Sequence, residues 1–267
     1  MMQPNYAVFA GKGNLPKLVI AELGNPKVIC FEGEQNPEIT PDVITRFGKV
    51  GFILDYLKEN NIQKIIFAGA MQRPDLKTLS PDAEGAKLLA KIVAGSFFSK
   101  GFGDDKLLSM LTKFLEDKGF QVVGAHEVLK DILAPKGSLG KIMLTANYED
   151  DIKIGIEAVK RIGELDIGQA VVVEDGIILA VEAVEGTANM IARAGEFKKS
   201  YGGVLVKFKK PDQLDKADLP SIGPDTIAQV KAAGIRGIAV EAGVTMLIDR
   251  AQIIEAADAA EVFIVGV

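Results

Sequence analysis

The first half of the chain alternates short apolar runs with stretches whose apolar residues recur at helical spacing. Strands are predicted at YAVFAG (6–11), KVICF (27–31), KIIFAGA (64–70) and FQVVGA (120–125). Between them, two amphipathic helices are predicted from apolar positions that include Val50, Ile53, Leu54, Leu57, Leu107, Leu108, Leu111, Phe114 and Leu115. This alternation is typical of parallel strands joined by crossover helices, so residues 1–133 are predicted to form a Rossmann-like, doubly wound α/β domain.

The second half follows a different pattern. Residues 134–147 contain a proline and two glycines without a sustained period, and we interpret them as a linker. Residues 148–267 are predicted to form a mixed α/β domain, in which two strands flank the turn signal Asp175-Gly176. The other predicted elements are strands at 203–208, 236–243 and 261–267 and helices at 148–162, 225–233 and 250–260.

Composition narrows the class of protein. A length of 267 residues favours two domains, and 48% hydrophobic with 25% charged residues is ordinary for a globular protein. A formal net charge of -5 argues against nucleic acid as a partner. No stretch approaches the roughly 18 to 20 apolar residues of a membrane span, and the first residues lack a signal-peptide pattern, so we expect a cytoplasmic protein.

Histidine and cysteine are too scarce for several classes of site. His126 and Cys30 are the only residues of their kinds, which excludes a site built from several histidines and an internal disulfide. Cys30 lies in an apolar run and is interpreted as a buried strand residue. A bound metal would be held by oxygen, which favours Mg²⁺ or Mn²⁺ over zinc.

A glycine turn follows the first predicted strand. Gly11, Lys12 and Gly13 precede a helical run, an arrangement that can direct backbone N–H groups and the helix N-terminus at a phosphate. Pro16 stands where a dinucleotide fingerprint would have its third glycine, while Glu32 has the spacing of a ribose-binding acid. A nicotinamide enzyme and a tight turn without a ligand therefore stay open as alternatives.

Three further groups of polar residues follow strands or begin helices in the first half. Arg73 could grip a phosphate or form a surface ion pair with Asp75. Asp104 and Asp105 could act as carboxylates in a site or cap a helix. His126 could donate to a phosphate or a uracil carbonyl, or make a structural hydrogen bond.

In the second half, Gln169, Glu185, Thr187 and Lys207 are predicted to lie in or beside strand ends. Asp218 lies in a segment rich in turn formers, where it could be a turn residue or a carboxylate directed into a cleft.

Ten sequence blocks follow one another along nearly the whole chain: GKGNLP, FGKVGFIL, FAGAMQRPDL, GDDKLL, GFQVVGAHEVL, LDIGQAVVVEDGIILAVEAVEGT, GVLVKFKKP, DLPSIGP, GIAVEAG and EAADAAEVFIVG. In this order they resemble the UDP-2,3-diacylglucosamine pyrophosphatase family that lacks the metallophosphatase fold. The resemblance implies metal-dependent hydrolysis of UDP-2,3-diacylglucosamine to 2,3-diacylglucosamine 1-phosphate and UMP, a step of lipid A synthesis. It also implies that the substrate lies between a Rossmann-like domain and a family-specific domain.

The resemblance also implies roles for individual residues. Asp218 becomes the essential catalytic carboxylate, which would hold the metal or polarise the attacking water. Ala188 follows Thr187 where family members are expected to have an acidic residue, which weakens a metal assignment to that loop. The substrate-binding residues implied are Gly11, Lys12, Gly13, Arg73, Gly103, Asp104, Asp105 and His126 from one domain and Gln169, Glu185, Thr187 and Lys207 from the other.

The lipid substrate and lipid product imply a shelter for acyl chains and transient contact with the inner membrane surface. A homodimer is left open. Two rival functions also stay open, namely an NAD(P)-dependent oxidoreductase acting on a nucleotide sugar, which the glycine turn and Glu32 favour, and a nucleotide- or lipid-binding module without turnover.

Overall fold

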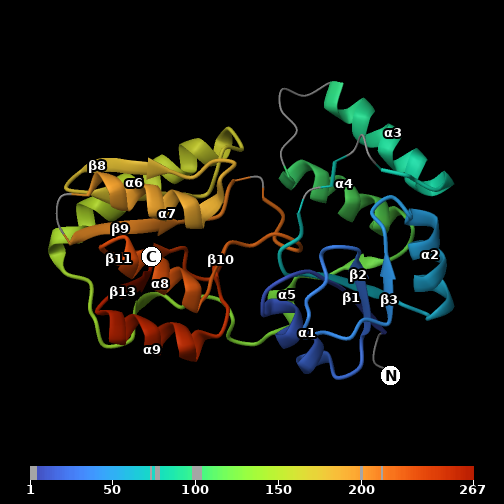
Figure 1. Ribbon diagram of the computed structural model, residues 1–267, viewed down its shortest axis with the longest axis horizontal. Coiled ribbons are helices and arrows are strands. Elements are labelled where there is room, and N and C mark those ends of the chain that lie inside the picture. The colour runs from blue at the N-terminus through green and yellow to red at the C-terminus, as the bar shows by residue number, and fades with distance from the viewer. Residues whose placement is uncertain (1–4, 73, 76–78, 98–103, 199–200, 212) are drawn as a thin grey trace. The chain divides into compact units, whose positions relative to one another are not determined.

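The computed structural model describes residues 5–72, 74–75, 79–97, 104–198, 201–211 and 213–267, with side chains for all of these except 95–97 and 104–105. The chain forms two compact units (Figure 1). Unit 1 consists of Met1–Leu129 and Leu214–Asp218, and unit 2 consists of Lys130–Gln213 and Leu219–Val267.

Unit 1 is built on a five-stranded sheet in the order β3-β2-β1-β4-β5, and all its strand pairs are parallel. The strands are β1 (Tyr6–Ala10), β2 (Lys27–Phe31), β3 (Val43–Thr45), β4 (Lys64–Ala68) and β5 (Gln121–Val122). Their side chains are largely buried, as expected when helices cover both faces of a parallel sheet. The prediction of a Rossmann-like, doubly wound domain is confirmed.

The helices of unit 1 position the loops that carry polar residues. One hydrophobic cluster joins the sheet to α2, α3 and α4, whereas α1 packs against β1, β4 and α5. The strand ends that follow β1 and β4 therefore meet beside α1, where ligands of doubly wound sheets usually bind. The helices are α1 (Leu15–Leu23), α2 (Val50–Glu59), α3 (Ala83–Phe97), α4 (Asp104–Asp117) and α5 (Ala125–Val128).

Unit 2 contains a six-stranded mixed sheet in the order β6-β13-β11-β9-β7-β8. The pairs β9–β11 and β11–β13 are parallel, and the other three are antiparallel. Two short strands, β10 and β12, pair separately. The strands are β6 (Gly137–Leu139), β7 (Ala170–Glu174), β8 (Ile177–Val181), β9 (Gly202–Lys207), β10 (Ser221–Ile222), β11 (Ile235–Val240), β12 (Met246–Leu247) and β13 (Phe263–Gly266).

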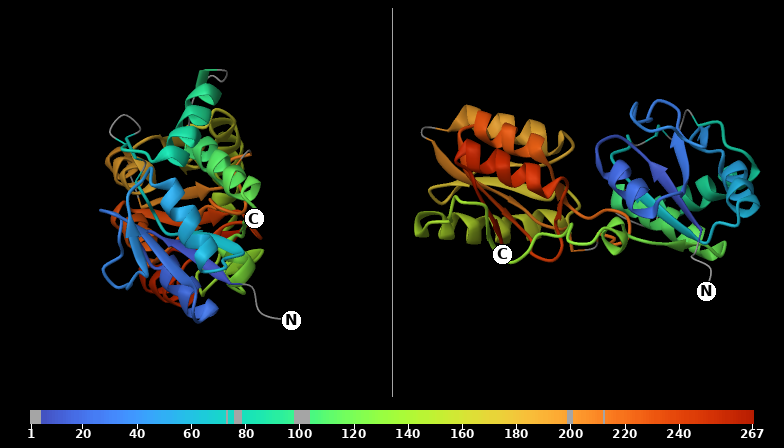
Figure 2. Two further views of the ribbon diagram at one scale, coloured as in Figure 1. Left: turned by 90° about the vertical axis from the view of Figure 1, so that its right-hand side faces the viewer. Right: turned by 90° about the horizontal axis from the view of Figure 1, so that it is seen from below.

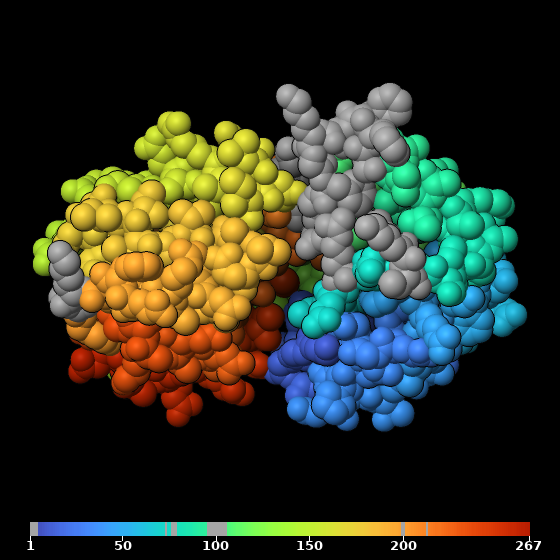
Figure 3. Space-filling model, turned by 45° about the horizontal axis from the view of Figure 1, so that its top comes forward, coloured from blue at the N-terminus to red at the C-terminus, as the bar shows by residue number. Residues whose placement is uncertain are grey.

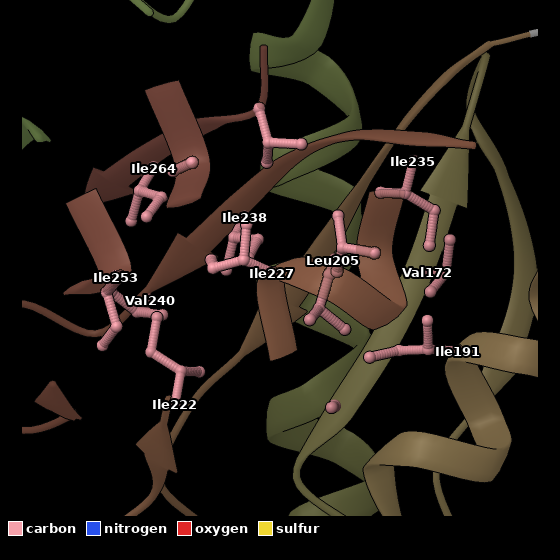
Figure 4. Packing of buried hydrophobic residues seen from close by; sticks show 14 of the residues in the cluster. Val172, Ile191, Leu205, Ile222, Ile227, Ile235, Ile238, Val240, Ile253 and Ile264 are labelled. Atoms are coloured by element: carbon pink, nitrogen blue, oxygen red, sulfur yellow. The ribbon is translucent and has the colours of Figure 1, made fainter. Parts of the chain in front are cut away.

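Helices cover both faces of this sheet, as Figure 2 shows. On one face, α6 packs so closely that a Cβ added at Gly155 would lie 2.4 Å from Val206 Cγ2. On the other face, Leu205 and Ile238 of the sheet meet Ile191 and Ile227 of the helices in one apolar layer (Figure 4). The helices of unit 2 are the 3-10 helix η1 (Ala146–Tyr148), α6 (Glu149–Glu164), α7 (Gly186–Phe197), α8 (Pro224–Ala232) and α9 (Arg250–Ala260). Figure 3 shows α7 on the outer surface of this unit.

The longer predicted elements are confirmed. The short strands β3, β6, β10 and β12, the short helices η1 and α5, and the longer helices α3 and α7 were not predicted. Residues 134–147, interpreted as a linker, include β6, which pairs with β13 inside unit 2. None of the helices within the described ranges is long and apolar enough to cross a membrane.

Candidate functional site

The glycine turn after β1 is joined to the loop after β4. The Gly11 N–H donates to the Ala68 carbonyl at 2.8 Å, and Lys12 and Ala70 exchange both backbone hydrogen bonds at 2.8 and 3.0 Å. A Cβ added at Gly11 would lie 2.4 Å from the Ala70 carbonyl oxygen. The glycine is therefore required for close approach of two backbones, and the N–H groups of Gly11 and Lys12 bind protein carbonyls. The turn also carries the ammonium of Lys12, whose side chain is half-exposed and therefore within reach of an anion.

A buried carboxylate that sequence reasoning missed lies beside this ammonium. Glu34 is 7% exposed, and its Oε2 lies 3.3 Å from Lys12 Nζ and accepts a 3.2 Å hydrogen bond from the Gln72 N–H. Glu32, the predicted ribose-binding acid, instead accepts a 2.8 Å bond from Arg46, and both side chains are more than half exposed. The pattern that suggested a nicotinamide enzyme thus combines a surface ion pair with a turn whose first two N–H groups are already bound.

Four of the predicted site residues are only partly described or lie beyond the described residues. Arg73 and Gly103 fall outside the described residues. Asp104 and Asp105 are the first two residues of α4, and only their backbone is described. Their roles stay predictions.

His126 and Asp218 belong to the same unit although they are far apart in sequence. Asp218 ends the short segment Leu214–Asp218, which packs with unit 1 rather than with the second half of the chain. Lys216 in this segment donates to Glu116 at 2.9 Å, and a Cβ added at Gly124 would lie 3.2 Å from the Asp215 carbonyl oxygen. The segment therefore rests against α4 and against the turn that carries His126.

The imidazole of His126 folds back over its own turn. A Cβ added at Gly124 would lie 2.5 Å from His126 Nδ1, so a side chain at position 124 would force the imidazole to move. Nδ1 is buried and has no hydrogen-bond partner among the described residues. A buried polar atom without a partner is uncommon in folded proteins and is a reason to consider a ligand at this position.

A second polar cluster lies in unit 2, where the hairpin β7–β8 opens towards α7 and β9. Lys207, 8% exposed at the end of β9, donates to Thr187 Oγ1 at 3.0 Å. The Thr187 hydroxyl donates to Glu182 Oε1 at 2.6 Å, and Glu182 Oε2 accepts the Gln169 N–H at 3.1 Å. We call Gln169, Glu182, Thr187 and Lys207 the hairpin cluster. Three of its members were predicted from the sequence, whereas Glu182 was not.

The elements that carry this cluster differ in part from the prediction. Gln169 directly precedes β7 and Lys207 ends β9, which confirms their placement at strand ends. Glu185 and Thr187 instead lie at the start of α7, a helix that was not predicted, so their placement at strand ends was wrong. The sequence signal was present: GTANMIARAGEF places apolar residues at helical spacing after the last strand residue.

Glu185 has a partner outside the hairpin cluster. Its Oε1 accepts a 2.6 Å hydrogen bond from Arg193, which lies about two turns further along α7. The pKa of Glu185 lies below its ordinary value. The larger cause is a hydrogen bond from its own backbone, and the second is the bond from Arg193. We therefore interpret Glu185 as an anchor for the start of α7.

The described side chains contain no group of three His, Cys, Asp or Glu residues that could form a metal cage. A divalent ion at the hairpin cluster or beside Asp218 would have to complete its coordination with phosphate oxygens and water. Mg²⁺ commonly binds in this way, with one or two protein carboxylates.

Comparison with known proteins identifies the family. Two family models match consecutive parts of the chain: the LpxI N-terminal domain over residues 5–132 and the LpxI C-terminal domain over residues 135–265. The chain belongs to the LpxI family. It is also 38% identical over 234 residues to the UDP-2,3-diacylglucosamine pyrophosphatase LpxI of Caulobacter vibrioides, a match that covers 85% of this chain and 82% of the relative. The two family models together cover parts of both units, including every candidate site residue named in this subsection.

Proposed function

We propose that this chain hydrolyses the pyrophosphate of UDP-2,3-diacylglucosamine, releasing UMP and 2,3-diacylglucosamine 1-phosphate for lipid A synthesis. The observation that carries the proposal is the match to the pyrophosphatase LpxI over 85% of the chain. The hairpin cluster supports it, because the buried ammonium of Lys207 suits a phosphate better than an uncharged ligand.

The reaction adds water across a P–O–P linkage: an oxygen of water bonds to one phosphorus while the bridging oxygen leaves with the other. Catalysis then consists mainly of neutralising charge and positioning the water. We assign charge neutralisation to Lys207 and Lys12, orientation of the Lys207 ammonium to Thr187, and contact with a donor group of the substrate to Gln169. Asp218 accepts the proton of the attacking water, and His126 binds the substrate near it.

We further propose that Mg²⁺ or Mn²⁺ accompanies the diphosphate, with Asp218 as one protein ligand. When bound, such an ion supplies further positive charge on the phosphate oxygens. Removal of divalent ions with EDTA is then expected to abolish UMP release, and added Mg²⁺ or Mn²⁺ to restore it. Full activity in EDTA would refute the metal dependence while leaving hydrolysis itself intact.

The assignment of Asp218 is tested by Asp218→Asn, which keeps the size of the side chain and removes its charge. We expect UMP release from the lipid substrate to fall by a factor of roughly 10³ or more, with little change in melting temperature. Asp215→Asn, at an exposed residue of the same segment, is the matched control and is expected to retain activity. Equal turnover in wild type and Asp218→Asn would remove Asp218 from the mechanism.

Contact with lipid is the last part of the proposal. Leu165 and Ile167 precede β7, and Val184 follows β8; they are 71%, 44% and fully exposed, respectively. Their two loops are adjacent, because a Cβ added at Gly168 would lie 2.2 Å from the Glu182 carbonyl oxygen. We propose that these apolar side chains contact acyl chains or the surface of the inner membrane next to the hairpin cluster.

Sedimentation with vesicles of phosphatidylethanolamine and phosphatidylglycerol tests this contact. Binding is expected to be weak without substrate and to increase when the diacylated UDP-sugar is included. Replacing the three apolar residues by serine should reduce it, and unchanged sedimentation would refute the contact. A homodimer and a substrate position between the two halves of the chain stay predictions.

A further inference from the structure

Glu182 is a buried carboxylate to which the proposed mechanism assigns no task. It follows β8, is 7% exposed, and uses its two oxygens for different partners. Oε2 accepts the backbone N–H of Gln169, whereas Oε1 accepts the hydroxyl of Thr187 at 2.6 Å. Burying a carboxylate is costly unless its oxygens are hydrogen-bonded, so this arrangement is specific rather than incidental.

We infer that Glu182 is a positioning residue, which orients Thr187 and through it the ammonium of Lys207. This inference rests on the proposed function. A hydroxyl has one proton, and here Glu182 accepts it, so the oxygen of Thr187 has only lone pairs to offer to other groups. Lys207 Nζ donates to that oxygen at 3.0 Å. The order of donors is thus fixed from Lys207 through Thr187 to Glu182.

A second observation connects Glu182 with a ligand. By accepting the Gln169 N–H, Glu182 holds the start of β7, and the side-chain oxygen of Gln169 is buried with no partner among the described residues. A buried acceptor of this kind needs a donor, which a hydroxyl or amide of a bound substrate would provide. Glu182 therefore contacts both Thr187 and Gln169, to which we assign the orientation of Lys207 and contact with the substrate.

Asp151 shows what a carboxylate with a purely structural task looks like in the same unit. It is 5% exposed and accepts the N–H groups of Asp175 and Gly176, both in the tight turn at the opposite end of the hairpin. Both of its oxygens bind backbone. Glu182 differs because one of its oxygens binds a side chain that in turn binds the buried lysine.

The experiment is a double-mutant cycle on UMP release from UDP-2,3-diacylglucosamine. Glu182→Gln keeps the size of the side chain but cannot accept both bonds, and Thr187→Val removes the hydroxyl. Each is expected to lower kcat by roughly 10- to 100-fold, with a smaller change in KM, because the Lys207 ammonium contributes most in the transition state, where negative charge develops on the phosphate oxygens. The double variant should be no slower than the slower single variant, since both changes interrupt the same chain of bonds.

Asp151→Asn is the matched control: it should lower the melting temperature without changing kcat. If kcat of the double variant falls by the product of the two single-variant factors, the inference is wrong. A wild-type kcat in Glu182→Gln would also overturn it. If Glu182→Gln does not fold, Thr187→Ser and Thr187→Val decide instead. Serine keeps the hydroxyl and should be at least tenfold more active than valine, and equal activity of the two would overturn the inference. A wild-type protein that releases no UMP would refute the proposed function itself, a result distinct from all of these.

Discussion

Replacing Gly11 by alanine tests the close approach of the loops that follow β1 and β4. The added Cβ would lie 2.4 Å from the Ala70 carbonyl oxygen and 2.9 Å from Met71 Cγ, whereas ordinary contact begins near 3.4 Å. The two loops would therefore have to separate by about 1 Å. The atom that blocks the new methyl group belongs to the backbone, so a change of side-chain rotamer cannot relieve the contact.

The expected cost follows from the hydrogen bonds that such a separation breaks. Three backbone bonds join the loops: Gly11 to Ala68, Lys12 to Ala70 and Ala70 to Lys12, at 2.8, 2.8 and 3.0 Å. At about 1 kcal/mol for each bond, the free energy of unfolding should fall by about 3 kcal/mol. For a unit of this size, that loss corresponds to a decrease in melting temperature of roughly 10 °C.

Thermal unfolding followed by circular dichroism measures the decrease, and hydrogen exchange locates it. The amides of Lys12 and Ala70 should exchange faster in Gly11→Ala, while those of unit 2 should be unchanged. The matched control is Gly13→Ala, because Gly13 has a φ of +90° and no atom within 4 Å of an added Cβ. There we expect only backbone strain, about 1 to 2 kcal/mol. If Gly11→Ala melts and exchanges like the wild type, the close contact between the loops is wrong.

Two other predictions concern carboxylates. Burial by itself would raise the pKa of Asp82, but hydrogen bonds from the Gly85 N–H and two N–H groups of α2 outweigh it and lower that pKa below 3.8. The stabilisation from Asp82 is therefore present above its ordinary pKa of 3.8 and is lost as the pH falls through the lowered pKa. Hydrogen exchange of the α2 and α3 amides should speed up over that acidic range, and Asp82→Asn should remove this dependence on pH. Lys198 and Glu174 form an ion pair at 2.7 Å in which the two side chains are 4% and 10% exposed. Lys198→Met should destabilise unit 2 by roughly 3 to 5 kcal/mol in urea denaturation, because it leaves the carboxylate of Glu174 buried without this lysine. Lys153→Met, at the exposed pair with Asp150, should cost less than about 1 kcal/mol. Equal urea midpoints for the two variants would refute this difference.

Local patterns along the sequence determined the long elements of both units. Runs such as VICF and IIFA are apolar throughout, as strands covered on both faces must be, and α2 repeats its apolar residues at helical spacing. Such patterns depend on residues close in sequence, so they can be read without the tertiary structure. The blocks that resemble a known family likewise depend only on their order along the chain.

Short strands carry too little pattern to be predicted in the same way. Residues 137–139 form β6 because β13, more than a hundred residues later, offers a free edge for antiparallel pairing. The same limit applies to β10 and β12, each of two residues, which pair with each other, while Met246 of β12 also bridges to Leu133. Their conformation is fixed by a partner that is distant in sequence.

The site depended most on the tertiary structure. Glu182 and Glu34 are two acidic residues among 36, and nothing in their neighbours distinguishes them from surface carboxylates. Glu182 matters because β7, β8, α7 and β9 bring Gln169, Thr187 and Lys207 to its two oxygens. The segment Leu214–Asp218 likewise packs with unit 1, although the chain on both sides of it belongs to unit 2. The sequence determined which residue types were present, and long-range packing decided which of them share a hydrogen bond, because burial and proximity are properties of the folded chain.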